Sequence, residues 1–406
     1  MSGLEQASAI GPTAGPAAEV SIAEVQPIVE QLLTSYPPQD VEQGSFLRAQ
    51  YDAGLAWVHF PVGLGGVGAD RRLQAHVDER LREAGAPQRP RDEMLGYRMG
   101  GPTVMGHGTL DQKQHFLPRI FTRQDRWCQL FSEPGSGSDL ASVATRARRD
   151  GTGWVVSGQK VWSSYAVGAT VGMLLARTDP DAPKHRGLTF FAIDMTDPGI
   201  DVRPLRQLTG EREFNEVFLT DVRVDDSARI GAEGNGWRIA QTTLASERGM
   251  YGSRGFGAAA RGTAIGEALT LWRGRTSQDE DEALRLRIVQ LWIDSRVLAW
   301  TNDRVAGAEA VPPPVAKIEF ARVQQRGFEL CLDLMGEEIL LGTNAPDGGP
   351  LFDADDVRHH FLRSRANSIE GGSSEIMHNV IARRVLGLPS DDTNKRDIPW
   401  SQLARN

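Results

Sequence analysis

Residues 129–139 read Gln-Leu-Phe-Ser-Glu-Pro-Gly-Ser-Gly-Ser-Asp, and this loop is the most informative stretch of the chain. Pro134 restricts the backbone, whereas Gly135 and Gly137 allow it to approach a ligand closely. The serine hydroxyls add hydrogen-bonding groups that suit flat heterocycles or phosphates. A glycine- and serine-rich loop on its own is usually a surface turn, so it indicates a ligand site only together with other segments.

A second segment, residues 158–164, reads Gly-Gln-Lys-Val-Trp-Ser-Ser and places an aromatic side chain beside hydroxyls. In this order, and in a chain of 406 residues, the two segments resemble the flavin-binding middle domain of the acyl-CoA dehydrogenase family. Residues 368–389 resemble the C-terminal signature of bacterial members, and residues 205–248 strengthen the likeness. The resemblance covers nearly the whole chain.

Composition excludes several other classes of protein. The apolar content of 40% fits a globular chain, and the net charge of −8 argues against a general nucleic-acid-binding surface. No apolar run approaches the ~20 residues of a membrane helix. Cys128 and Cys331 have no metal-ligand spacing, so a reduced cytoplasmic chain is favoured over a single disulfide. We therefore expect a cytoplasmic protein with no metal, nucleic-acid or membrane partner.

The chain divides by composition into three zones between two ends. Residues 1–20 are interpreted as a flexible leader without signal-peptide features. Apolar spacings of three and four predict an α-helical domain over residues 21–127, and short apolar runs between Gly and Pro turns predict strands over 128–238. Residues 239–388 are predicted to form a helical bundle, followed by a polar tail over 389–406 that wraps or frays.

Some elements can be placed more closely. Asp150–Gly153 predicts the turn of a β-hairpin, and Val161–Ser164 is predicted to be a short strand. Spacing predicts a helix beginning at Ile22 and a final helix capped by Ser373 or Ser374. The order helical, β, helical is the three-domain plan of the family. We therefore expect an α+β fold with an N-terminal helical domain, a middle antiparallel β-barrel and a C-terminal four-helix bundle.

The resemblance implies FAD-dependent α,β-dehydrogenation of an acyl-CoA thioester, in fatty-acid, branched-acyl or sterol side-chain catabolism. A base takes the α-proton, and the β-hydride passes to flavin N5 while hydrogen bonds polarise the carbonyl. A carboxylate in a dry pocket suits the base, because desolvation raises its pKa. An electron-transferring flavoprotein is the implied acceptor, and the implied assembly is a dimer or tetramer, possibly heteromeric.

Two positions compete for the role of base. Many family members carry a Glu just before Gly-Thr in the C-terminal signature, and the matching position here is Gly371, which cannot act as a base. Glu370 is one residue away and is the second choice. Other members carry the base in a Glu-Arg pair on the first helix after the barrel, which Glu247 and Arg248 match. We predict Glu247 as the base and Arg248 as an orienting group, although such a pair is in general more often a solvated face.

The resemblance also implies the flavin contacts. Trp162 would cover the ring face, where the alternative is an ordinary buried aromatic. Ser164 would bond near N5, and Ser138 would also reach the CoA side. Ser373 and Glu375 would meet the adenosine half at a helix N-terminus that suits a pyrophosphate, or would simply cap the helix. The predicted cofactor residues are Gln129, Phe131, Ser132, Gly137, Ser138, Trp162, Ser164, Ser373 and Glu375.

Two departures from the family pattern keep alternatives open. The usual Arg-x-x-Phe-Gly stretch is absent, and residues 333–339 are a degraded form of Gln-x-x-Gly-Gly-x-Gly. The second hypothesis is therefore a low-activity or flavin-poor subunit of a heteromeric acyl-CoA dehydrogenase. The third is a flavin monooxygenase or oxidase on the same scaffold, which Glu247 opposes because such relatives usually lose the base.

Overall fold

The computed structural model describes residues 20–252, 262–275, 281–307, 313–340, 352–389 and 397–403, without the side chains at 91, 247–252, 305–307 and 313. The chain splits into two compact units. The first comprises Met1–Arg89 and Lys113–Gln124, and the second comprises Pro90–Gln112 and Asp125–Asn406. Most of the predicted leader lies outside the described residues.

The first unit is helical, as the apolar spacing predicts. Helix α1 begins after Ser21, whose backbone N–H donates to the Glu24 carboxylate at 2.8 Å in a capping box. Its Val25, Val29 and Leu32 are buried in a core shared with the other helices. The helices of this unit are α1 (Ile22–Ser35), α2 (Gln43–Asp52), α3 (Leu73–Glu83) and most of α5 (Leu110–Phe121).

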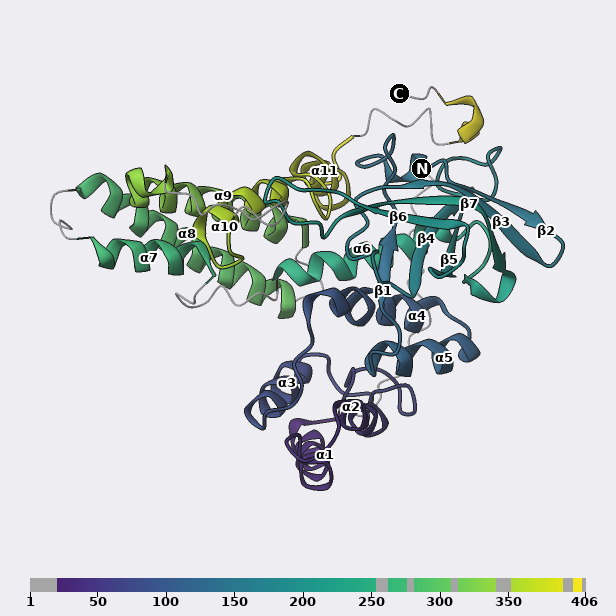
Figure 1. Ribbon diagram of the computed structural model, residues 1–406, viewed down its shortest axis with the longest axis horizontal. Coiled ribbons are helices and arrows are strands. Elements are labelled where there is room, and N and C mark those ends of the chain that lie inside the picture. The colour runs from purple at the N-terminus through teal and green to yellow at the C-terminus, as the bar shows by residue number, and fades with distance from the viewer. Residues whose placement is uncertain are drawn as a thin grey trace, which may run out of the picture. The chain divides into compact units, whose positions relative to one another are not determined.

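The second unit is built around a sheet of eight strands in the order β6-β7-β3-β2-β4-β5-β8, with β1 paired to β4 (Figure 1). The predicted hairpin is confirmed, because Gly151 adopts φ 61° between β2 and β3. The strands are β1 (Trp127–Leu130), β2 (Arg146–Asp150), β3 (Gly153–Lys160), β4 (Val171–Arg177), β5 (Leu188–Asp194), β6 (Ile200–Pro204), β7 (Asn215–Asp225) and β8 (Arg229–Ile230).

The sheet corrects the prediction in two respects. It is mixed rather than wholly antiparallel, because β1 pairs with β4 in parallel after the chain crosses over through the β2–β3 hairpin. Val161–Ser164 is not a strand, because the backbone leaves the ladder at Trp162, which has φ 62°. The ordered path ends at β6 and β8, and no pairing joins them among the described strands. Closure into a barrel therefore stays a prediction.

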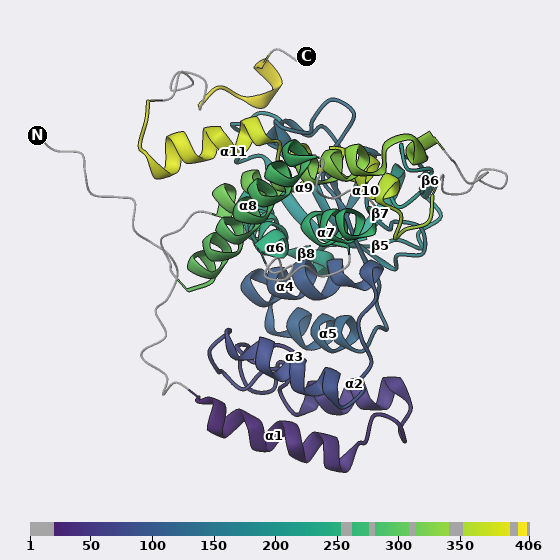
Figure 2. The same cartoon turned by 90° about the vertical axis from the view of Figure 1, so that its left-hand side faces the viewer.

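Helices before and after the sheet complete the second unit. Helix α6 packs against β5 and then against α9, and α7, α8 and α9 lie side by side (Figure 1). Helix α11 also packs on α9 (Figure 2). The longer elements are α4 (Gly101–His107), α6 (Gly236–Gly252), α7 (Ala264–Gly274), α8 (Glu282–Gly307), α9 (Pro313–Met335), α10 (Val357–Ser364) and α11 (Ser374–Val380).

Short helical turns join these elements. A π-helix, η2 (Gly96–Gly100), precedes α4, and a second one, η8 (Ile381–Val385), continues α11. Gly100 lies so close to Trp127 that an added Cβ would be 2.8 Å from the indole ring. The 3-10 turns are η1 (Arg91–Glu93), η3 (Leu140–Ser142), η4 (Asp226–Ala228), η6 (Gly336–Leu340), η7 (Arg365–Ser368) and η10 (Trp400–Gln402).

Candidate active site

The loop at 131–145 is held from inside the sheet domain by a buried ion pair. The Lys160 ammonium lies 2.8 Å from the Glu133 carboxylate and also donates to the carbonyls of Phe131 and Leu175. Glu133 accepts from the backbone N–H groups of Ala144 and Thr145. Burial opposes the charged carboxylate, but the Lys160 charge and the donated hydrogen bonds hold the pKa of Glu133 below its usual value. One charge pair thus fixes both ends of the loop.

A second buried cation supports the same loop from β4. The Arg177 guanidinium donates to the carbonyls of Ala141, Val143 and Lys184 at 2.6, 3.0 and 3.2 Å. The Trp400 ring lies 4.2 Å from its Cζ atom, in a cation–π arrangement. Burial lowers the pKa of Arg177 to about 10. The Trp400 backbone N–H in turn donates to the carbonyl of Ala182, so this part of the C-terminal tail is docked.

The two segments that the sequence singled out meet at the ends of β1 and β3. The Val161 N–H donates to the Ser132 carbonyl at 2.9 Å. Ser163 is buried and exchanges two backbone hydrogen bonds with Asn215, which fixes the turn that follows β3. Within this turn Trp162 keeps φ 62°, a costly conformation for a residue with a Cβ, and its side chain is 61% exposed. An exposed indole on a strained turn is typical of a ligand site rather than of packing.

The predicted cofactor residues of the middle domain lie on the loop and on the turn that this junction joins. Phe131 has its side chain in the core, edge-on to Phe190, and its carbonyl already accepts from Lys160, so that its backbone N–H is the group left for a ligand. Gln129 and Ser164 are half-buried, whereas Gly137 and Ser138 are exposed. The structure thus brings together the residues on the loop and the turn.

The C-terminal signature forms a separate part of the candidate site. Ser373 caps α11 by accepting the Ile376 N–H at 3.3 Å. Glu375 is exposed, and its own backbone N–H and the Ser373 hydroxyl lower its pKa. The buried Lys317 ammonium donates to the Gly372 carbonyl at 2.6 Å, beside a turn in which Gly372 has φ 96°. No described contact joins Ser373 or Glu375 to the loop at 129–139.

Glu370 is already engaged within the protein. Its carboxylate lies 2.9 Å from the Arg363 guanidinium, which is also 3.4 Å from Glu213. Glu213 in turn accepts from the Tyr165 hydroxyl at 3.2 Å. The neighbouring Phe214 ring lies edge-on to Trp162, with centroids 6.0 Å apart. Glu370 therefore belongs to a network that ends at the Trp162 turn, and its carboxylate is already bonded to Arg363.

The predicted base lies on α6, but the side chains of Glu247 and Arg248 are outside the described residues. One turn earlier, the Thr243 hydroxyl is buried at 2.9 Å from the Thr103 hydroxyl of α4. This pair fixes α6 against α4, against which the helix also packs.

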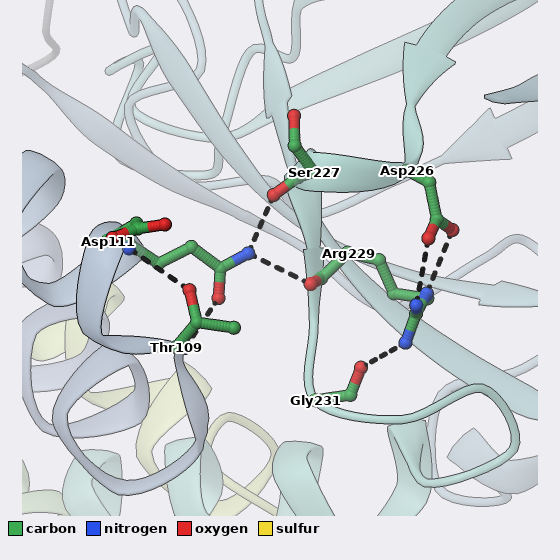
Figure 3. A pocket seen from close by; sticks show the side chains of 7 residues that line it. Thr109, Asp111, Asp226, Ser227, Arg229 and Gly231 are labelled. Carbon is green, nitrogen blue, oxygen red and sulfur yellow. Dashed lines mark hydrogen bonds and ion pairs between the residues drawn. The ribbon is translucent and has the colours of Figure 1, made fainter. Parts of the chain in front are cut away.

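A pocket of about 370 Å³ lies elsewhere in the second unit, beside β8 (Figure 3). Gln112 crosses it and donates to the carbonyls of Ser227 and Arg229, while Arg229 pairs with Asp226. These polar groups therefore bond one another. None of the predicted site residues lines this pocket. Its lining residues are Thr109, Asp111, Gln112, Asp226, Ser227, Arg229 and Gly231.

Sequence reasoning missed the residues that support the loop. Lys160 occupies an inward position of β3, in register with the buried Trp154 and Val156, and a charged residue at such a position signals a buried partner. Glu133 lies inside the quoted loop itself. Within the described residues, no cluster of three or more metal-ligating side chains occurs, and no helix is long and apolar enough to cross a membrane.

Family models match three consecutive parts of the chain. They are the N-terminal, middle and C-terminal domains of acyl-CoA dehydrogenase, at residues 17–124, 128–222 and 234–386. The chain is 38% identical to acyl-CoA dehydrogenase IpdE1 of Mycobacterium tuberculosis over 352 residues, which cover 84% of this chain and 86% of that protein. The chain belongs to the acyl-CoA dehydrogenase family, and it is an oxidoreductase that acts on acyl-CoA.

Further relatives place the chain within this family. Acyl-CoA dehydrogenase FadE34 of Mycobacterium tuberculosis is 40% identical over 348 residues, which are 83% of this chain but 45% of FadE34, so the chain spans less than half of that protein. The solved Tcur3481-Tcur3483 steroid ACAD matches with a TM-score of 0.70 at 23% identity, covering 91% and 98% of the two chains. The ChsE4-ChsE5 complex of Mycobacterium tuberculosis gives 0.67 at 24%, covering 90% and 97%. Both structures support the fold.

Proposed function

We propose that this chain binds FAD at the Trp162 turn and dehydrogenates an acyl-CoA between Cα and Cβ, with Glu247 as the base. The observation that carries the proposal is the strained and exposed Trp162. It follows Val161, whose N–H donates to the carbonyl of Ser132 in the loop after β1. Acyl-CoA dehydrogenases are in general FAD-dependent. The turn offers a large aromatic face, backbone groups and hydroxyls in one place, which suits a flat heterocycle with a polar edge.

The residues that would hold FAD lie in two places: where β1 and β3 end, and at the N-terminus of α11. Trp162 would cover one face of the ring, and the backbone of Phe131 and Ser132 would meet its polar edge. Ser164 would bond near N5, with Gly137 and Ser138 further along the loop. Ser373 and Glu375 would meet the adenosine half. FAD, when bound, accepts the β-hydride of the substrate at N5.

Glu247 would remove the α-proton, and Arg248 would orient the thioester or the carboxylate. Helix α6 packs against α4, and the buried Thr103–Thr243 pair fixes it one turn before position 247. A carboxylate in a dry site has a raised pKa and works as a base near neutral pH. Loss of the proton from Cα and of the hydride from Cβ leaves the enoyl thioester. Glu370 is the weaker candidate because Arg363 already holds it.

A direct test uses anaerobic flavin bleaching. The purified protein is mixed with a panel of acyl-CoAs of straight, branched and steroid-bearing acyl groups, and the flavin absorbance is followed. We expect bleaching with at least one substrate and a loss of about 10²–10⁴-fold in rate for Glu247→Gln. Glu370→Gln is the matched control, because it makes the same chemical change at the second candidate for the base. Equal bleaching rates for Glu247→Gln and the native protein would refute the role of Glu247.

The steroid-bearing arm of the panel follows from a structural neighbour that is called a steroid ACAD. We propose that the substrate belongs to fatty-acid or sterol side-chain catabolism and that an electron-transferring flavoprotein accepts the electrons. Reoxidation of the bleached flavin by a purified electron-transferring flavoprotein, monitored without oxygen, tests the acceptor. Reoxidation by oxygen alone would favour an oxidase instead.

The second candidate function is a flavin-poor subunit of a heteromeric enzyme. Gly371 stands where many members carry a base, and two solved neighbours are complexes or pairs of different chains. In that case the protein would be purified without flavin and would acquire it only on co-expression with a related chain. A full complement of FAD in the protein purified alone would exclude this alternative.

A further inference from the structure

The turn after β3 is held in an unfavourable backbone conformation by the residues that lead into β7. Trp162 and Tyr165 have φ 62° and 54°, which costs free energy in residues that carry a Cβ. The Tyr165 N–H donates to the Glu213 carbonyl at 2.7 Å, and the Tyr165 hydroxyl donates to the Glu213 carboxylate at 3.2 Å. Two backbone hydrogen bonds also join Ser163 to Asn215. The shape of the turn therefore depends on where Glu213 and Asn215 lie.

Arg363 of α10 contacts the same residues from the helical side. Its guanidinium lies 3.4 Å from the Glu213 carboxylate, and its Cζ atom is 5.9 Å from the centre of the Phe214 ring. The Phe214 ring lies edge-on to the indole of Trp162. The same guanidinium is 2.9 Å from the Glu370 carboxylate. One side chain thus connects the C-terminal signature to the Trp162 turn.

The shape of arginine suits this connection. Its planar fork of five N–H donors can pair with two carboxylates and lie against an aromatic ring at once, whereas lysine offers a single point charge. The side chains of Arg363, Glu213 and Glu370 are 30%, 20% and 21% exposed, so solvent ions screen these pairs less than pairs on the open surface. A guanidinium held by two carboxylates has a defined position.

A second ion pair joins α10 to the loop before β7. The His359 Nε2 atom lies 3.0 Å from the Glu211 carboxylate, one helical turn before Arg363. Glu211 otherwise bonds within its own loop, to Thr209 and Gln207. The two pairs therefore allow docking of α10 on this loop to be separated from positioning of the turn.

We propose that Arg363 is a positioning residue for the Trp162 indole. It acts on the indole through Glu213 and Phe214, and it ties the place of the indole to the C-terminal signature through Glu370. The inference rests on the proposed function, in which the indole covers the flavin ring. A binding group is placed precisely only when the residues behind it are themselves fixed. Arg363 would connect the two places at which FAD is held.

Fluorine NMR of the FAD-free full chain tests the positioning without flavin. The nine tryptophans are replaced by 5-fluorotryptophan, and Trp162→Phe identifies the signal of residue 162. We expect Arg363→Met to shift or broaden that signal, because the Phe214 ring beside the indole is no longer fixed. Glu213→Gln leaves Arg363 paired with Glu370 and should change the same signal, which gives a second measurement if Arg363→Met does not fold. The double variant should change it by less than the sum of the two.

Two control variants separate this effect from general damage. Arg365→Met removes a neighbouring arginine of similar exposure, 34%, which pairs with Glu329 of α9 at 2.8 Å. Glu211→Gln removes the docking pair with His359. Both should leave the signal of residue 162 in place. An unchanged signal in Arg363→Met, or an equal change in either control, would overturn the proposal.

Titration with FAD connects the positioning to the cofactor. We expect FAD to shift the signal of residue 162 in the native chain and to bind Arg363→Met about fivefold more weakly, with Arg365→Met binding as the native chain does. Native affinity in Arg363→Met would overturn the role in flavin binding. If bound FAD left the signal of residue 162 unchanged in the native chain, the proposed function of the turn would fail, and the FAD-free spectra would still assign the turn to Arg363.

Discussion

The ammonium of Lys160 lies 2.8 Å from the carboxylate of Glu133, and the two side chains are 0% and 9% exposed. Lys160 is the last residue of β3, whereas Glu133 lies in the loop that follows β1. The pair therefore joins the two segments that carry the candidate flavin contacts. It is a structural link, and it can be tested without any ligand.

We expect Glu133→Gln to destabilise the protein by about 3 kcal/mol, because it leaves the Lys160 charge buried without its counter-ion. Lys160→Met should destabilise the protein by a similar amount, because it leaves the buried Glu133 carboxylate without its counter-ion. The double variant Glu133→Gln/Lys160→Met should be markedly less destabilised than the sum of the two single changes. Urea unfolding of the four proteins measures this coupling. Additive losses would show that the two charges act independently.

The same carboxylate predicts how stability depends on pH. The pKa of Glu133 is lower in the folded protein than its usual value of 4.5, so the unfolded chain binds more protons in acid. Its contribution is fully present above the unfolded pKa and is lost as the pH falls below it. The free energy of unfolding should therefore decrease from about pH 6 to pH 4 less steeply in Glu133→Gln than in the native protein. Parallel curves would contradict this assignment.

Trp400 should protect the loop through Arg177. Removing the ring in Trp400→Ala exposes one face of the buried guanidinium, and the cation–π contact contributes about 1–2 kcal/mol when it is desolvated. We expect the amides of Ala144 and Thr145 to exchange with deuterium about tenfold faster, measured by mass spectrometry on the FAD-free protein. Trp400→Phe keeps an aromatic face and should exchange nearly as slowly as the native chain. Unchanged exchange in Trp400→Ala would refute the coupling.

Glu370 should behave as a structural residue. Glu370→Gln weakens the contact with Arg363, a partly exposed pair that contributes on the order of 1 kcal/mol. We expect a small loss of thermal stability and less than about a tenfold change in the rate at which the α-proton of a bound acyl-CoA exchanges with solvent. Proton exchange is followed by NMR in deuterium oxide. A loss of several hundredfold would instead make Glu370 the base.

Sequence patterns predicted the elements whose signal is local. The spacing of Val25, Val29 and Leu32 gives α1, and the Gly151 turn gives the β2–β3 hairpin. The prediction of a strand at Trp162 is wrong, because the left-handed turn depends on a tertiary contact, the two backbone hydrogen bonds between the neighbouring Ser163 and Asn215. Parallel pairing of β1 with β4 is likewise a tertiary property that residue types do not carry.

The sequence likewise predicted only part of the candidate site. The loop and the Trp162 turn do come together, because both follow strand ends of one sheet. The spacing of Lys160 with Trp154 and Val156 does indicate a buried charge, but its partner Glu133 and the role of Arg177 depend on contacts with residues far along the chain. The assignments of Glu247 and of the cofactor contacts stay predictions that the experiments above address.

The docked end of the chain also bears on how the protein is made. Ser401 donates to Asp181, a residue 220 positions earlier, and the adjoining Trp400 covers Arg177. A nascent chain leaves the ribosome from its N-terminus, so the sheet is synthesised long before this cover exists. The loop beside β4 can therefore reach its final packing only after translation has passed residue 400. Until then the loop at 131–145 lacks the support that Trp400 gives it through Arg177.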